Sequence, residues 1–210
     1  MFKYLKNKEK IKVKDFGAGS RVFKSNNREI KKIAKNVLKK PKYSRILFKI
    51  IRKNKAKYIL ELGTSLGLTT QYLAKANSKD LIYSLEGCPE TIKVAKKGFE
   101  KNKISNIKVI EGNFDDSLPK LLSLIPQIDF AFIDGNHQRV PTEKYFISLL
   151  EKAHSETVLV FDDIHWSEEM EEAWETIKNH FRVTATIDLY SIGIVFFKQG
   201  LSKQHFTIKY

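Results

Sequence analysis

The feature that most constrains this chain is an alternation of short apolar segments with amphipathic segments from Tyr58 to His180. Each apolar segment is expected to be a strand, and a helical pattern follows each of them. Because parallel strands need a crossover between them, this order favours a doubly wound α/β sheet with helices on both faces. The expected strands are residues 58–62, 81–85, 107–110, 128–133 and 157–161, and the expected helices are residues 68–76, 90–102, 117–124, 142–154 and 168–180.

The end of the chain breaks the alternation. Residues 182–189 and 192–197 both have strand patterns, and only Tyr190 and Ser191 separate them. Two strands this close in sequence must pair antiparallel. The sequence therefore predicts a mostly parallel sheet that ends in an antiparallel hairpin.

The N-terminal quarter is different from the rest in charge. Residues 1–57 contain 21 of the 38 Lys and Arg but 3 of the 24 Asp and Glu, whereas residues 58–210 have a net charge of −4. Residues 1–24 are expected to be irregular, and helices are expected at residues 26–38 and 43–54. We expect residues 1–57 to be a basic helical extension or lid, and residues 58–210 to be the main domain. The extension could attract nucleic acid or another polyanion, although a solvated helical face is the interpretation we favour.

Localisation and redox state follow from simple features. No apolar run reaches the roughly 20 residues of a membrane helix, and the basic N-terminus lacks the apolar core of a secretory signal. Cys88 is the only cysteine, which excludes an internal disulfide. We therefore expect a cytoplasmic protein with no membrane span.

A nucleotide-type site is expected where the first two strands end. Gly63 and Gly67 lie in the loop after the first strand and are expected to let the backbone approach a ligand closely. Glu86 directly follows the second strand, where a carboxylate can accept hydrogen bonds from both ribose hydroxyls. A dinucleotide-binding loop needs a glycine at the position of Ser65, and the acidic Glu61 suits phosphate poorly. A positively charged cofactor without phosphate fits this loop better.

Five motifs stand in order along the chain: YILELGTSLGLTT, IYSLEG, IKVIEGNFDDSLPKLL, IDFAFIDGNHQ and VLVFDDIHWS. Together they resemble the class I S-adenosylmethionine-dependent methyltransferases, in particular the small-molecule O-methyltransferases of the catechol and tailoring type. The resemblance spans about residues 43–198. It implies a seven-stranded sheet in the order 3-2-1-4-5-7-6, with S-adenosylmethionine as the cofactor, and relatives are commonly homodimers.

Carried over by position, the resemblance assigns the cofactor site. Glu86 would hold the ribose, and Asp134 would close the site below the methyl donor. A turn role is the alternative for Asn113. The other implied contacts are Glu61, Gly63, Thr64 and Ser65, with Gly67, at the methionine end, and Gly112, Asn113 and Phe114 around the adenine.

A carboxylate cluster is expected at the ends of the fourth and fifth strands. Asp134 ends one, and Asp162 and Asp163 end its neighbour, so the three would repel one another unless a cation lay between them. Hard divalent ions, Mg²⁺ first among them, take such oxygen ligands. Metal-dependent members of the family bind an ion at this place. In a metal-free alternative, Asp162 and Asp163 cap the next helix.

Two histidines are candidates for the general base. His137 stands where the catechol type has a lysine, three residues after Asp134, and His165 is the second candidate. For each, the alternative is a supporting or surface role. The catechol type also has an amide at the position of Asp163.

The function predicted from these features is O-methylation of a small hydroxylated molecule. The main alternative is methylation of RNA or another polyanion drawn in by residues 1–57. A non-enzymatic cofactor-binding scaffold and a dehydrogenase are further alternatives. Asp15–Arg21 could wrap an anion or form an ordinary turn, and aromatic residues could line an acceptor pocket or fill the core: Phe16, Phe23, Tyr43, Trp166 and Tyr190.

Overall fold

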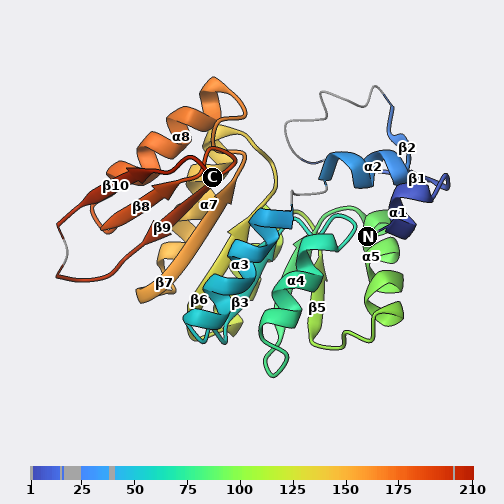
Figure 1. The fold of residues 1–210 in the computed structure, drawn as a ribbon, viewed down its shortest axis with the longest axis horizontal. Coiled ribbons are helices and arrows are strands. Elements are labelled where there is room, and N and C mark those ends of the chain that lie inside the picture. Colours follow the sequence, from blue (N-terminus) through green and yellow to red (C-terminus); the bar gives the residue numbers. More distant parts are fainter. Residues whose placement is uncertain (1, 15, 17–24, 38–40, 201) are drawn as a thin grey trace.

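A computed structural model describes residues 2–14, 16, 25–37, 41–200 and 202–210 (Figure 1). Asp15, Phe23 and residues 17–22, on which part of the expected anion loop and acceptor pocket fall, lie outside these ranges. The elements are α1 (Phe2–Lys6), β1 (Lys10–Lys12), β2 (Asn27–Glu29), α2 (Ile30–Val37), α3 (Pro41–Lys53), β3 (Ile59–Leu62), α4 (Leu68–Ala76), β4 (Ile82–Glu86), α5 (Pro89–Lys101), β5 (Ile107–Glu111), α6 (Phe114–Leu124), β6 (Ile128–Ile133), α7 (Arg139–Leu150), β7 (Ala153–Asp162), α8 (Glu168–Asn179), β8 (Ala185–Asp188), β9 (Ile192–Phe196) and β10 (Gln204–Thr207).

The main sheet has the strand order β10-β8-β9-β7-β6-β3-β4-β5. Strands β3 to β7 are parallel to one another, and β9 is antiparallel to both β7 and β8. The predicted α/β fold with a mostly parallel sheet and an antiparallel hairpin is therefore confirmed. The expected count of seven strands is wrong, because the chain continues past the hairpin and β10 pairs in parallel with β8.

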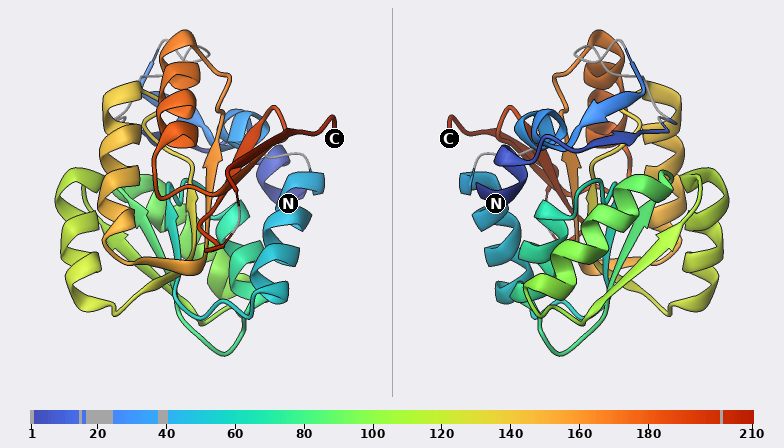
Figure 2. Two further views of the ribbon diagram at one scale, coloured as in Figure 1. Left: turned by 90° about the vertical axis from the view of Figure 1, so that its left-hand side faces the viewer. Right: turned by 90° about the vertical axis from the view of Figure 1, so that its right-hand side faces the viewer.

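Helices cover both faces of the sheet (Figure 2). On one face α6, α7 and α8 pack on the sheet around Tyr145, Phe146 and Trp174. On the other face α3 and α4 pack on it, through Tyr43, Leu47 and Leu73 among others. Helix α3 thus shares a core with the sheet although it precedes residue 57, so the division of the chain at that residue stays a prediction.

The N-terminal residues contain more regular structure than expected. Strands β1 and β2 form a short antiparallel ladder, in which Ile11 is opposite Arg28. Helix α2 begins at Ile30 and not at residue 26 as expected, because residues 27–29 form the second strand of this ladder. Other boundaries moved as well: α6 and α7 each begin three residues earlier than expected, at Phe114 and Arg139. Because β7 begins at Ala153, α7 ends at Leu150 and does not reach residue 154.

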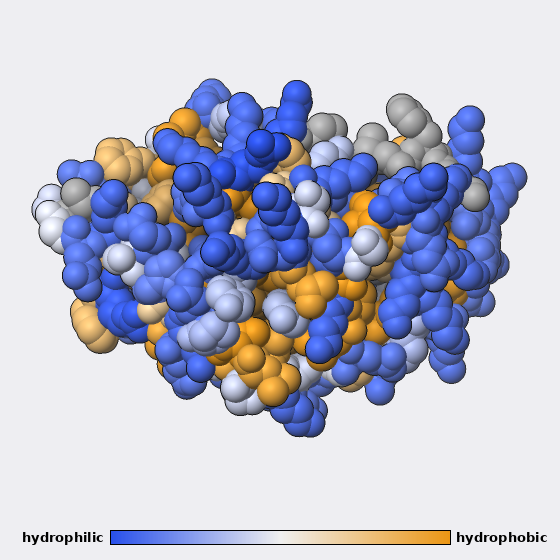
Figure 3. Space-filling model, turned by 90° about the horizontal axis from the view of Figure 1, so that it is seen from below, coloured by the Kyte–Doolittle hydropathy of each residue, from blue (hydrophilic) through white to orange (hydrophobic). Residues whose placement is uncertain are grey.

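Within the described residues, no helix is both long and apolar enough to cross a bilayer. Seen from below the view of Figure 1, apolar side chains gather near the centre of the face and hydrophilic ones surround them (Figure 3). The candidate site lies at the carboxyl ends of the parallel strands.

Candidate active site

The loop between β3 and α4 is tied to the end of β4. The backbone N–H groups of Gly63 and Thr64 both donate to the carbonyl of Leu85, at 3.0 and 3.2 Å. Thr64 Oγ1 and Ser84 Oγ, 2.5 Å apart, share a hydrogen bond beneath the loop. Ser65 has a φ of 47°, so the loop turns through left-handed backbone there. These bonds fix the loop as one unit with the β4 end.

The two loop glycines make room for protein atoms. A Cβ on Gly63 would lie 2.0 Å from the Asp134 carbonyl oxygen, and one on Gly67 would lie 2.5 Å from the Phe99 ring. We expected these glycines to make room for a ligand. The structure shows that close packing against the β6 loop and α5 also requires glycine at both positions, and their contact with a cofactor stays a prediction.

Glu86 joins the glycine loop to the loop after β4. Its Oε2 accepts from the Ser65 N–H at 2.7 Å, and its Oε1 accepts from the Cys88 N–H at 2.8 Å. Burial raises the pKa of Glu86, and these backbone bonds offset only part of the effect. Since a carboxylate has about four lone-pair sites, both oxygens can still accept from a ribose.

Glu61 is fully buried below the loop. Thr70 Oγ1 and Ser84 Oγ both donate to its Oε2 at 2.6 Å, whereas Oε1 has no hydrogen-bond partner among the described residues. Burial raises the pKa of Glu61 to about 8, despite the hydrogen bonds from Ser84 and Thr70. The acid expected to suit a cationic cofactor is therefore neutral at pH 7, and a nearby cation would favour its ionised form.

Ser84 and Thr70 support this site and were not predicted from the sequence. Ser84 interrupts an otherwise apolar strand pattern, and both side chains are buried. A small hydroxyl inside a buried strand needs a hydrogen-bond partner, and this was the available signal.

Glu61→Gln should make the free energy of unfolding less dependent on pH between pH 6 and 8. The folded state keeps the Glu61 proton up to about pH 8, while the unfolded state loses it near pH 4.5. Stability is therefore lost as pH rises through this window, by about 2 kcal/mol between pH 6 and 8. Urea unfolding at both pH values should show this loss in the natural protein and not in Glu61→Gln. The exposed Glu111→Gln is the control, and an equal loss in Glu61→Gln would contradict the expectation.

The acidic cluster lies where β6 and β7 end side by side. Ile133 is in register with Phe161, which brings the next residues, Asp134 and Asp162, together. One ligand atom each of Asp134, Asp162 and His137 lies within 4.8 Å of the others. His137 Nε2 is 3.7 Å from Asp134 Oδ1. Two carboxylates and an imidazole are a donor set that suits a divalent cation.

Among the described residues, the group of ligand atoms that lie close together does not include Asp163. The backbone N–H of Asp163 donates to the Ser191 carbonyl at 2.8 Å, and the Asp163 carbonyl accepts from the Trp166 N–H at 2.9 Å. Its role as a metal ligand stays a prediction. The alternative that Asp162 and Asp163 cap α8 is wrong, because the Ser167 side chain caps that helix.

His165 has carboxylates at both ring nitrogens. Nε2 lies 2.9 Å from Asp188 Oδ2 and Nδ1 lies 3.1 Å from Glu171 Oε1, and the ring stacks on Tyr190. Partial burial lowers the pKa of His165, but the bonds to Asp188 and Glu171 outweigh it and the pKa is raised. This favours the protonated ring and leaves His137 as the better-placed base.

The loop after β5 lies next to the β6 loop. Asn113 caps α6, since its side chain accepts from the Asp115 N–H. The Phe114 ring lies against Gly135, where an added Cβ would come within 2.7 Å of it, and packs edge-on against Tyr145. The expected adenine contacts therefore share one end of the sheet with Asp134, and their roles stay predictions.

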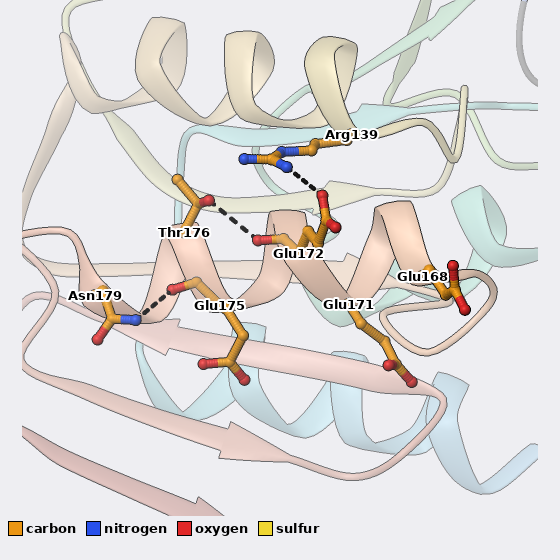
Figure 4. A pocket seen from close by; sticks show the side chains of 7 residues that line it. All are labelled: Arg139, Glu168, Glu171, Glu172, Glu175, Thr176 and Asn179. Atoms are coloured by element: carbon orange, nitrogen blue, oxygen red, sulfur yellow. Dashed lines mark hydrogen bonds and ion pairs between the residues drawn. The ribbon is translucent and has the colours of Figure 1, made fainter.

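A hollow lies on the surface of α8 (Figure 4). Arg139 bonds to Glu172, and Thr176 and Asn179 donate to carbonyls within α8 itself. These contacts belong to the helix surface, and the hollow contains none of the expected site residues. It is lined by Arg139, Glu168, Glu171, Glu172, Glu175, Thr176 and Asn179.

A sequence model of the methyltransferase domain family matches residues 60–164, from β3 to the loop after β7. The chain belongs to this family. The resemblance to class I S-adenosylmethionine-dependent methyltransferases is thereby confirmed. The match covers every strand end that contributes to the site, so the methyltransferase domain includes the glycine loop, Glu86 and the acidic cluster.

Individual relatives agree with this membership. A catechol O-methyltransferase from Niastella koreensis is 32% identical over 112 residues, which are 52% of this chain and 50% of that protein. The chain therefore spans about half the length of the curated relative that it matches. The methyltransferase domain also resembles solved structures at low identity, which shows the shared fold.

Several of these structures contain the cofactor or its product, among them two O-methyltransferases. An O-methyltransferase from Bacillus cereus in complex with S-adenosylhomocysteine has a TM-score of 0.63 and 21% identity, over 75% of this chain and 82% of that one. The O-methyltransferase TomG from Streptomyces achromogenes, in complex with S-adenosylmethionine, has a TM-score of 0.66 and 15% identity, over 76% and 81%.

Proposed function

We propose that the protein is an S-adenosylmethionine-dependent O-methyltransferase for a small hydroxylated molecule. The observation that carries the proposal is the contact between the two halves of the site. Gly63, in the loop assigned to the methyl donor, packs against the carbonyl of Asp134, whose carboxylate belongs to the acidic cluster. A donor held by the loop and an acceptor held by the cluster would therefore meet.

The proposed cofactor site follows the strand ends. Glu86 holds the ribose and Asp134 closes the site below the methyl group. The methionine end meets Glu61, Gly63, Thr64, Ser65 and Gly67, and the adenine meets Gly112, Asn113 and Phe114.

The donor set of the acidic cluster fits a divalent cation, with Asp134 and Asp162 as its carboxylate ligands. Such an ion, when bound, lowers the pKa of an acceptor hydroxyl and holds its oxygen. Mg²⁺ is the ion expected from these carboxylates, and the imidazole of His137 is kept for proton transfer rather than for the metal. Asp163 is kept as a further ligand to be tested.

His137 is proposed to take the proton of the acceptor hydroxyl. The oxygen then forms a bond to the methyl carbon in line with the breaking bond from sulfur to that carbon. The sulfur keeps the electron pair, and S-adenosylhomocysteine is released. The enzyme's main contribution is alignment of the two reactants, since both bind at one sheet end.

The acceptor is proposed to be a phenolic or sugar hydroxyl, and the name of the Niastella relative supports the phenolic class. Residues 1–57 are proposed to be the extension that covers the site. A homodimer and a cytoplasmic location stay predictions.

Calorimetric titration of S-adenosylhomocysteine, with Mg²⁺ and then with EDTA, tests the cofactor class. We expect micromolar binding, and Glu86→Gln should weaken it about 10- to 100-fold, because hydrogen bonds to a charged group are lost. Glu90→Gln is the matched control, since Glu90 is an ion-pair partner of Lys93 on the nearby α5. Binding of NAD or RNA with no binding of S-adenosylhomocysteine would sink the proposal.

A further inference from the structure

The N-terminal elements hold the glycine loop from outside the main sheet. Leu66, at the tip of this loop, is completely buried and packs with Ile11, Ile30 and Ile33. These residues come from β1 and α2, which lie above α5 at the right of Figure 1. One of the two loops assigned to the cofactor is therefore anchored in the N-terminal part of the chain.

The second cofactor loop has an anchor in the same segment. The Lys14 N–H donates to Cys88 Sγ at 3.3 Å, and Cys88 Sγ lies 3.7 Å from the Lys12 carbonyl oxygen, to which it donates. The N–H of Cys88 also binds Glu86. Residues 12–14 thus run along the loop that carries the proposed ribose carboxylate.

Phe16 packs against Gly87, the residue that directly follows Glu86. Its ring lies where a side chain at position 87 would be, since a Cβ on Gly87 would be 2.6 Å from two ring atoms. The ring is 41% exposed, and Lys14 Nζ lies 4.6 Å from its centre. Gly87 follows Glu86 directly, so an exposed aromatic surface stands next to the proposed ribose site.

We propose that Phe16 forms a wall of the nucleoside part of the cofactor site. This inference rests on the proposed function. The ring gives the ribose and adenine an apolar, planar surface that Gly87 cannot supply, and aromatic rings stabilise such contacts by stacking. Because the segment also contacts both cofactor loops, through Ile11 on one and Lys12 and Lys14 on the other, cofactor binding and the packing of this segment stabilise each other reciprocally.

Titration of S-adenosylhomocysteine into Phe16→Ala tests the proposed wall. The dissociation constant is expected to rise about tenfold, and Phe16→Leu should fall between Phe16→Ala and the natural protein. Phe206→Ala is the matched control, because Phe206 is a similarly exposed phenylalanine on the edge strand β10. An affinity of Phe16→Ala within twofold of that control overturns the inference.

Gly87→Ala gives a second and independent measurement. The added methyl group must displace the Phe16 ring, so this variant should lose about as much affinity as Phe16→Ala. The double variant should lose little more than either single one, because both changes remove the same contact. Fully additive losses overturn the inference.

Hydrogen exchange separates a binding wall from simple packing. S-adenosylhomocysteine should slow exchange of the Val13 and Lys14 amides, which bond to the Asn26 carbonyl and to Cys88. This slowing should disappear in Phe16→Ala. Unchanged exchange in a natural protein that binds the compound overturns this inference alone, whereas a natural protein that does not bind it overturns the proposed function as well.

Discussion

Gly63→Ala should be among the most destabilising single substitutions in this protein, at about 3–5 kcal/mol. The φ of Gly63 is 107°, which a residue with a Cβ rarely adopts, and the added Cβ would lie 2.0 Å from the Asp134 carbonyl oxygen. Neither backbone can give way easily, since the Gly63 N–H is bonded to Leu85 and the Asp134 N–H is bonded to Leu62. Thermal unfolding should show a midpoint about 10 °C lower.

Gly200→Ala separates the two causes of this loss. Gly200 also has a positive φ, of 80°, but nothing lies within 4 Å of the position its Cβ would take. Gly200→Ala should therefore lower the free energy of unfolding by only about 1 kcal/mol, from backbone strain. If Gly63→Ala lost no more unfolding free energy than Gly200→Ala, the close approach to Asp134 would not explain the need for glycine at position 63.

The arrangement of the core could be predicted from sequence because its strands have strong apolar patterns. The strand at residues 59–62 is wholly buried, so its pattern reports its position directly. Strand β10 has four exposed residues and gives no such pattern, which is why it was missed. The ladder of β1 and β2 was missed for the same reason, since Ile11 is the one buried residue of β1.

The candidate site was predictable where it depends on strand order. Asp134 and Asp162 follow neighbouring parallel strands, so their proximity follows from the topology alone. The inclusion of His137 depends on left-handed backbone at Asn136 and His137, with φ values of 71° and 42°, which a sequence pattern does not show. The contact of Phe16 with Gly87 joins residues far apart in the chain, and no local pattern predicts it.

Asp162→Asn and Asp134→Asn should have the largest effects on activity. Each removes one of the two carboxylates proposed to hold a divalent cation, and metal assistance contributes several kcal/mol to such reactions. We expect turnover of a catechol acceptor to fall about 1,000-fold, which corresponds to about 4 kcal/mol. Binding of Mn²⁺, followed by electron paramagnetic resonance, should weaken in parallel.

Two further variants decide what that loss means. Asp116→Asn, in the exposed first turn of α6, controls for the removal of one negative charge and should keep both turnover and Mn²⁺ binding. Asp163→Asn distinguishes two sets of carboxylate ligands. A parallel loss of Mn²⁺ affinity would make Asp163 a ligand, and unchanged affinity would leave Asp134 and Asp162. If Asp162→Asn lost turnover in EDTA as strongly as with metal, its carboxylate would act on the cofactor or acceptor directly and the proposed cation would be superfluous.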